Sequence, residues 1–197
     1  MPPVIPWLSE WLSTVPTRTP VCVTWRARVP DAVAGRFRRS GFAVTAAAGW
    51  QVDLGGDLVR IEQGGTHDTL VVEPIAVRHP SPSTGRLIAV GVATVDHERL
   101  ARDLEIELSA IAGEEPSIGA RSWSVPGTRL RLLEPSTEGR LAAALARHGE
   151  GPIALYLGVG DTGLFVRASP SGPAGPALAP AASGPFMFVT RDGGGRP

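Results

Sequence analysis

The chain has 197 residues, 43% of them apolar, and a formal net charge of zero. A chain of this length can bury a real hydrophobic core in one large domain or two small ones. Zero net charge offers no field to hold a polyphosphate, so nucleic acid is not expected as a partner. No apolar run approaches the length of a membrane span, and the N-terminus lacks the pattern of a signal peptide, so we expect a cytoplasmic protein.

Three residue types are rare or missing, and each absence excludes a chemistry. Cys22 is the only cysteine, so the chain can form no internal disulfide and no metal site built on cysteine. Lysine and asparagine are both absent, which excludes a lysine Schiff base and the lysine of a phosphate-binding P-loop. Because both missing residues have A-rich codons, we attribute their absence to a high-GC genome of the actinobacterial type.

The first block of regular structure follows a proline-punctuated leader over residues 1–19. Residues 21–29 read as a strand, and the next helix has Asp31 near its start and Gly41 at its end. The stretches FAVTAA, WQVDL, LVRIEQ and TLVVEP then predict strands. A linker rich in proline and serine occupies residues 78–86.

The second block repeats this order. A strand over 87–95 precedes a helix capped by Asp96, and further strands are predicted in IELSAI, ARSWSV and TRLRLLEP. A helix over 137–148 leads to a third strand start at 152–159. FVRAS and FMFVTR are predicted as later strands, separated by a stretch over 169–185 whose composition predicts a surface loop.

The strand starts recur at a nearly constant spacing. Thr24 and Ala89 are 65 residues apart, and Ala89 and Pro152 are 63 residues apart. This period predicts an internal repeat of βαβββ modules. The chain divides into a leader, two complete modules, and a linking helix with an incomplete third module: 1–19, 20–80, 86–136 and 137–197.

Three stretches resemble a known family. Residues 29–42 (VPDAVAGRFRRSGF) and 89–96 (AVGVATVD) look like the strand-to-helix opening of a glyoxalase-like module. Residues 130–159, with LLEP, a helix and Gly-Glu-Gly, resemble the join between the two modules of methylmalonyl-CoA epimerases. The chain therefore resembles the glyoxalase/bleomycin-resistance/dioxygenase (vicinal oxygen chelate) superfamily. The resemblance implies an α+β fold in which repeated βαβββ modules form curved mixed sheets around a central cup.

The same resemblance implies where a divalent metal would be held. The opening-strand positions correspond to Thr24, Ala89 and Pro152, and the closing-strand positions to Leu70 and Arg131. None of these offers the histidine or carboxylate lone pairs that a metal needs, and arginine repels a cation. We therefore expect the scaffold with a degenerate metal site, no metal and no other cofactor.

Alternate residues of a strand face opposite sides of its sheet, which divides the predicted strands into two faces. One face is apolar and is expected beneath the helices. The other carries short side chains, one tyrosine and several arginines, and guanidinium groups bind carboxylate or phosphate bidentately. We predict that this second face lines the cup and binds a ligand. Its predicted ligand-binding residues are Thr24, Arg26, Ala89, Arg129, Arg131 and Tyr156.

The sequence leaves open which modules pair. If the first and second modules pair, Arg26 and Arg131 share the cup. If the second and third pair, Arg131 lies with Tyr156 instead. An unpaired module exposes strand edges, which favours a homodimer or a tight intrachain pair.

Three functions fit this pattern. The first is metal-independent binding of an anionic or polar small molecule, in secondary metabolism or resistance. The second is an isomerase, lyase or cyclase that uses the same cup, with Tyr156 as acid or base and Arg26 or Arg131 stabilising an enolate or carboxylate. The third is a metal-dependent epimerase with ligands among His67, His79 and Glu73.

The remaining titratable residues are predicted in structural or solvated positions. His97 stands at a helix start, and Glu134 is expected in a structural or edge role near a strand end. Glu115 and its neighbouring glutamates are expected to be solvated.

Overall fold

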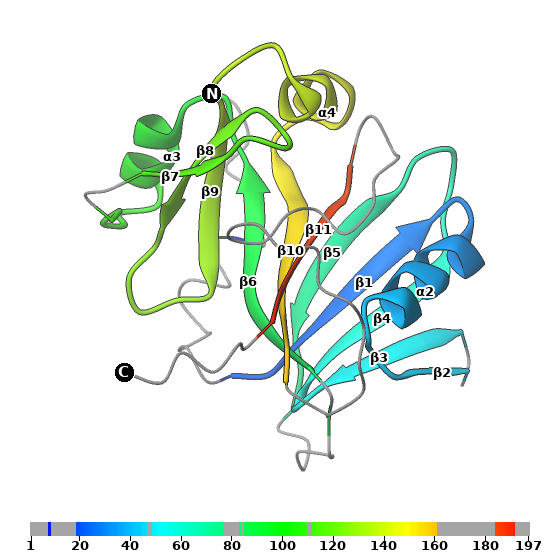
Figure 1. Cartoon of the computed structure of the whole chain (residues 1–197). Helices are drawn as coiled ribbons and strands as arrows, with labels where there is room; N and C mark the ends of the chain where they lie inside the picture. The colour runs from blue at the N-terminus through cyan, green and yellow to red at the C-terminus, as the bar shows by residue number, and fades with distance from the viewer. Residues whose placement is uncertain are drawn as a thin grey trace.

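In the computed structural model the chain forms two mixed β-sheets flanked by short helices (Figure 1). The structure describes residues 8, 19–46, 49–76, 83, 85–109, 112–160 and 184–191. Most of the predicted leader, linker and loop lies outside these residues, as do the FVRAS stretch and His79. None of the described helices combines the length and the apolar character needed to cross a membrane.

The described helices and strands follow the predicted order closely. The elements of the first sheet and its helix are β1 (Val21–Ala27), α2 (Pro30–Arg39), β2 (Val44–Ala46), β3 (Trp50–Leu54), β4 (Asp57–Gln63) and β5 (Thr69–Pro74). The elements that follow are β6 (Gly85–Ala93), α3 (His97–Asp103), β7 (Gly113–Glu115), β8 (Ala120–Ser124), β9 (Leu130–Pro135), α4 (Arg140–His148), β10 (Gly151–Val159) and β11 (Phe186–Arg191).

The first module has the predicted βαβββ order. β1 lies parallel to β4, while β2, β3 and β4 run antiparallel to one another, so the order of the first sheet is β2-β3-β4-β1-β5. Between β1 and β2, α2 begins with Pro30 and carries Asp31 in its first turn. Proline suits this position because the first helical N–H has no partner, and an acid there interacts favourably with the helix dipole. Gly41 follows the helix with a φ of +95°, as its predicted role requires.

The second module repeats this arrangement. β6 lies parallel to β9, and β7, β8 and β9 form an antiparallel run. The helix α3 begins after Asp96, whose carboxylate accepts a hydrogen bond from the Arg99 N–H at 2.8 Å, so the predicted N-cap is confirmed. The predicted α+β fold of repeated βαβββ modules in curved mixed sheets is confirmed by this shared strand order.

The third predicted strand start joins the sheet of the second module. β10 pairs antiparallel with β6, and β11 pairs parallel with β10. This parallel pair repeats the relation between the opening and closing strands of the other two modules. The order of the second sheet is β11-β10-β6-β9-β8-β7, so the second and third predicted modules are the ones that lie side by side.

Two sequence predictions about strands are wrong. The described part of IELSAI, residues 106–109, is not a strand, because Ile106 and Leu108 pack against the core after α3 and the strand forms later, as β7. The closing strand of the first module is β4, because β5, which contains Leu70, runs antiparallel to β1. Leu70 is therefore not the counterpart of Arg131. The similar sequences LVVEP and LLEP carry no information about strand direction.

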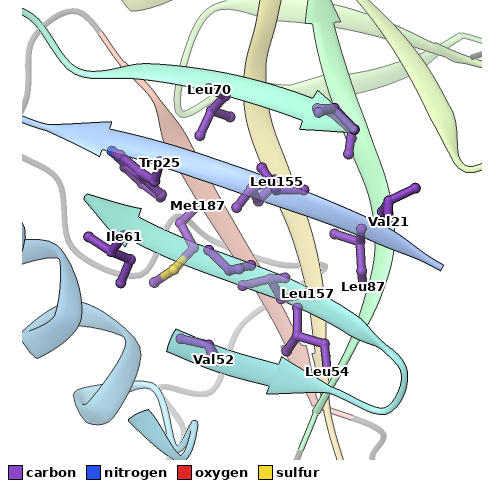
Figure 2. Packing of buried hydrophobic residues seen from close by; sticks show 14 of the residues in the cluster. Val21, Trp25, Val52, Leu54, Ile61, Leu70, Leu87, Leu155, Leu157 and Met187 are labelled. Carbon is purple, nitrogen blue, oxygen red and sulfur yellow. The ribbon is translucent and has the colours of Figure 1, made fainter. Parts of the chain in front are cut away.

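The main hydrophobic core lies between the two sheets (Figure 2). On the first sheet, Trp25 and its alternate neighbours in β1 point into this core, and on the second sheet Leu155 and Leu157 of β10 do so. Trp25 is fully buried and meets Phe37 of α2 edge-on, with ring centroids 6.1 Å apart. Burial of each large side chain contributes roughly 1.5–3 kcal/mol, so this shared core holds the sheets together.

A second core lies on the opposite face of the second sheet. Leu141 and Leu145 of α4 pack there with Leu133 of β9 and Ile153 of β10. The second sheet therefore buries apolar side chains on both faces. The first sheet has most of its large apolar side chains on one face, and its other face carries more exposed side chains such as Arg26.

An ion pair joins the first sheet to the turn before β9. The guanidinium of Arg129 binds the carboxylate of Asp57, and the two side chains are 16% and 10% exposed. Asp57 also accepts a hydrogen bond from the Val21 N–H at 2.9 Å, and Arg129 donates to the Thr19 carbonyl at 2.6 Å. Each charge is thus compensated at a place where water is largely excluded.

We expect Arg129→Met to lower the free energy of unfolding by about 3 kcal/mol, because it leaves the Asp57 carboxylate buried without its partner. Urea denaturation measures this loss. Adding Asp57→Asn to the same variant should recover part of it, since the uncompensated charge is then removed. Arg60→Met serves as the control and should cost less than about 1 kcal/mol, because Arg60 and Glu62 lie 3.8 Å apart with both side chains 40% exposed. Equal losses at the two arginines would contradict the prediction.

Candidate functional site

The second sheet curls toward the face that carries Arg131 and Tyr156. Glu115 of β7 and Tyr156 of β10 interact closely enough for each side chain to alter the pKa of the other. Four strand-to-strand steps separate β10 from β7, a distance of roughly 19 Å in a flat sheet. Two side chains cannot span that distance, so the sheet must bend round to bring them together. We call the resulting surface the curled face, defined by Ala89, Gly91, Glu115, Arg131, Ala154, Tyr156 and Phe188.

Strand register places short side chains at the middle of the curled face. Gly91 of β6 lies opposite Arg131 on one side and Ala154 on the other, and Tyr156 lies opposite Ala89. A β-carbon at Gly91 would approach Leu133 Cδ1 to 2.7 Å and Tyr156 Cε2 to 3.2 Å. The missing side chain at Gly91 therefore leaves room for Leu133, for Ala154, whose β-carbon would lie at 2.9 Å, and for the tyrosine ring.

Three planar groups are layered on this face. The rings of Tyr156 and Phe188 stack with centroids 4.7 Å apart and planes 10° apart. On Tyr156 lies the guanidinium of Arg131, with its central carbon 4.5 Å from the ring centroid. A cation over an aromatic ring is attracted by the ring quadrupole. The ring therefore holds the guanidinium close to it while the Arg131 side chain stays 33% exposed.

Glu115 completes the polar group. Its Oε1 lies 3.5 Å from Arg131 Nη1, and its side chain is 12% exposed. Burial raises the pKa of this carboxyl above its usual value, although Tyr156 and Arg131 both act to lower it. Burial also raises the pKa of the Tyr156 phenol, and the negative charge of Glu115 adds to that effect. The phenol therefore keeps its proton and can donate a hydrogen bond, while burial disfavours the charged form of Glu115.

The Tyr156 hydroxyl is buried, and it makes no geometrically complete hydrogen bond within the described part of the chain. Glu115 and Arg131 both lie close enough to interact with the phenol oxygen, although neither meets the full geometry of a hydrogen bond. A buried polar group without a partner costs about 1–3 kcal/mol. This cost at the centre of an arginine–glutamate pair marks the position as a candidate binding site.

The structure divides the predicted site residues between two surfaces. Ala89, Arg131 and Tyr156 lie together on the curled face. Thr24 and Arg26 lie on the first sheet, where they alternate with Trp25, which points toward the second sheet. Their side chains therefore point away from the curled face, and the predicted meeting of Arg26 with Arg131 does not occur. The physical reason is that the apolar face of β1 is the one that packs against β10.

Arg129 also lies apart from the curled face, since its guanidinium binds Asp57 of the first sheet. Strict alternation predicted that it would share a face with Arg131. Arg129, however, precedes β9 and belongs to the turn, where strand alternation does not apply. Whether any predicted residue binds a ligand stays a prediction.

Sequence reasoning missed two members of the curled face. Glu115 was expected in solvent, but its side chain is largely buried because β7 is carried round by the curl. Phe188 lies in the predicted strand FMFVTR, and its parallel pairing with Tyr156 in β10 places it on this face. Strand alternation could have assigned Phe188 a face, whereas no local pattern predicts the approach of Glu115.

A second polar cluster occupies the opposite face of the second sheet. The His97 ring stacks on Trp123 with centroids 3.6 Å apart, and its Nδ1 lies 2.5 Å from Glu134 Oε2. Arg121 lies 3.7 Å from the same carboxylate oxygen. These contacts tie the first residue of α3 to β8 and β9. Among the described residues, no three histidine, cysteine or carboxylate side chains gather closely enough to hold a metal ion.

No family model and no curated protein matches this chain. Solved structures with partial likeness include a hypothetical protein from Bacillus halodurans, 22% identical over 40% of this chain and 61% of that one, with a TM-score of 0.33. A variant of Streptomyces coelicolor methylmalonyl-CoA epimerase with 2-nitronate-propionyl-CoA is 23% identical over 39% and 64%, with a TM-score of 0.32. A methylmalonyl-CoA epimerase with methylmalonyl-CoA and NH4+ is 18% identical over 57% and 97%, with a TM-score of 0.40.

This chain spans less than two thirds of the length of the first two of these proteins. Two of the three structures are methylmalonyl-CoA epimerases, the family that residues 130–159 resemble. These TM-scores are too low to support an assignment of fold or function. The fold assignment rests on the strand order of the two sheets.

We expect Gly91→Ala to lower the free energy of unfolding by about 1–3 kcal/mol, because the new methyl group overpacks the space beneath Tyr156. Chemical denaturation measures the loss, and near-ultraviolet circular dichroism reports the displaced tyrosine. The control is Gly151→Ala in β10, where no atom lies within 4 Å of an added β-carbon. Equal stability of the two variants would contradict the role assigned to Gly91.

The raised pKa of Glu115 predicts a pH dependence of stability with a defined sign. Below 4.5, the ordinary value for glutamate, the carboxyl is protonated in both the folded and the unfolded chain. As the pH rises past that value, the unfolded chain ionises first, so folding loses stability. The stability of Glu115→Gln relative to the natural chain should therefore increase between about pH 4 and pH 7. Thermal unfolding across this range tests the sign, with Glu62→Gln as the exposed control; a relative decrease would be contrary to the prediction.

Proposed function

We propose that the curled face binds an anionic or polar small molecule without a metal, with Arg131 and Tyr156 as its main contacts. The observation that carries the proposal is the buried Tyr156 hydroxyl, which has no complete hydrogen bond within the described residues and lies beside a partly exposed guanidinium. A ligand oxygen placed between them would accept hydrogen bonds from both groups. Such charge-assisted bonds are among the strongest polar contacts in proteins.

The surroundings support binding of this kind. Arg131 lies against the Tyr156 ring, which restricts the side-chain freedom that it would lose when a ligand binds. Ala89 and Gly91 project little from the sheet, and the buried Phe188 ring supports the tyrosine. Concave sites that combine apolar walls with a few fixed polar groups are typical of small-molecule binding.

A second candidate function is an isomerase, lyase or cyclase on the same face. The observation that favours it is Glu115, a largely buried carboxyl whose pKa is raised by burial and which lies 3.5 Å from Arg131. A general acid or base works best when its pKa approaches the operating pH. In that function Glu115 would exchange a proton with the substrate, Tyr156 would donate to the developing oxyanion, and Arg131 would compensate its charge.

The predicted homodimer stays a proposal alongside these functions, as do the metal-free and cytoplasmic character of the protein. A dimer would cover strand edges that the second sheet leaves at β7 and β11.

We expect at least one compound in a thermal-shift screen of acyl-CoAs and polycyclic carboxylates to stabilise the natural chain. Arg131→Gln should weaken that binding by at least tenfold, because it removes a charge-assisted contact worth about 1.5–3 kcal/mol. Isothermal titration calorimetry measures the change. The matched control is Arg60→Gln, since Arg60 also pairs with a glutamate from its own sheet, at 3.8 Å, but lies on the first sheet. Loss of binding at Arg60 with none at Arg131 would place the ligand on the wrong sheet and reject the proposal.

The same ligand separates binding from catalysis. In deuterated water, an enzyme with Glu115 as its base would exchange a substrate proton, which NMR detects as loss of a carbon-bound hydrogen signal. Glu115→Gln should abolish that exchange and keep the binding. A ligand that binds and emerges unchanged supports the binding protein.

A further inference from the structure

Arg131 carries a positive charge that Glu115 compensates only loosely. The two atoms that define the ion pair are 3.5 Å apart, whereas a charge-assisted N–H to carboxylate bond is typically about 2.7–2.9 Å long. Arg131 is also 33% exposed, while Glu115 is 12% exposed. The exposed side of the guanidinium can therefore donate further N–H hydrogen bonds. Its ion pair with the Glu115 carboxylate is weak.

We propose that the ligand carries a single carboxylate, and that this carboxylate replaces Glu115 as the partner of Arg131 while Glu115 takes up a proton from solvent. This inference rests on the proposed function and names its ligand class. Two ionised carboxylates beside the single guanidinium of Arg131 repel each other, and the repulsion favours protonation of the more buried one. Protonation of Glu115 removes that repulsion and turns the carboxyl into a hydrogen-bond donor.

The groups around Glu115 make it the one that takes the proton. From β9 it meets Arg131 and from β10 it meets Tyr156, while the residue opposite it on β8 is Ala120. Burial already disfavours the charge on this carboxyl. Tyr156 remains a donor throughout, because its pKa is raised by burial and by the same carboxylate. The Tyr156 hydroxyl can therefore donate a hydrogen bond to the ligand. Glu115 is the group that takes up a proton when the ligand binds.

Charge and shape select a carboxylate over other anions. With Glu115 protonated, the site has one positive charge, which a monoanion compensates and a phosphate dianion exceeds. A planar carboxylate also matches the guanidinium fork with two parallel bonds. The stacked rings of Tyr156 and Phe188, together with Ala89, are at most 5% exposed and form the buried apolar packing beside the ion pair.

The test uses three probes of one shape: 2-naphthoate, 2-naphthamide and 2-naphthyl phosphate, titrated into the whole chain by calorimetry. We expect 2-naphthoate to bind at least tenfold more tightly than the amide or the phosphate. Titrations in two buffers of different ionisation enthalpy should show net proton uptake with 2-naphthoate. Its affinity should consequently fall as the pH rises from about 5.5 to 7.5.

Glu115→Gln should bind 2-naphthoate more tightly at pH 7.5 than the natural chain does and should take up no proton. The matched control, Glu62→Gln, changes a glutamate that pairs with Arg60 on the other sheet and should leave both quantities unchanged. Equal affinity for the amide, absence of proton uptake, weaker binding by Glu115→Gln, or no saturable binding of 2-naphthoate up to about 10 mM would each overturn the carboxylate inference. If Arg131→Gln binds every ligand as the natural chain does, the proposed function itself is wrong.

Discussion

Each sheet of this protein can present only one face to the other, and that constraint governs everything else in the structure. The apolar face of β1 packs against the apolar face of β10 through Trp25 and Leu155 (Figure 2). Because strand side chains alternate, this choice turns Thr24 and Tyr156 outward on opposite sides of the molecule. The shared core therefore decides which polar residues can meet, although none of those residues takes part in it.

The two sheets contain the same βαβββ module but differ in the strand that is added beside the opening strand. In the first sheet the strand added beside the opening strand, β5, follows β4 after a short loop. In the second sheet the equivalent neighbour, β10, comes after α4, which covers one part of the outward face with Leu141 and Leu145. The first sheet thus keeps one surface with charged and exposed side chains, and the second acquires a second core. The candidate site lies where that second core meets Arg131.

The candidate site departs from the rule that buried polar groups are satisfied. Glu115 is largely buried beside a guanidinium at 3.5 Å, and the Tyr156 hydroxyl makes no complete hydrogen bond within the described residues. Both features cost stability, and such costs are expected where a surface is prepared for a ligand. The Asp57–Arg129 pair is more tightly bonded, although Arg129 Nε is also buried without a hydrogen bond among the described residues. The partly exposed guanidinium beside the Tyr156 hydroxyl is therefore the strongest physical reason to place function on the curled face.

The sequence by itself determined the local structure and most of the fold. Alternation in β1, the Asp96 cap and the stop at Gly41 are local properties, and the repeat spacing predicted the modules. In β10 a register shift between Pro152 and Ala154 interrupts the alternation, so Ile153 and Leu155 lie in different cores. The sequence also predicted Arg131 and Tyr156 as site residues that meet if the second and third modules pair. Only the tertiary structure decided that these modules do pair, that Arg26 lies elsewhere, and that Glu115 reaches Tyr156. Strand periodicity specifies which face a side chain takes, but the curvature of a sheet and its choice of neighbour arise from packing between distant segments.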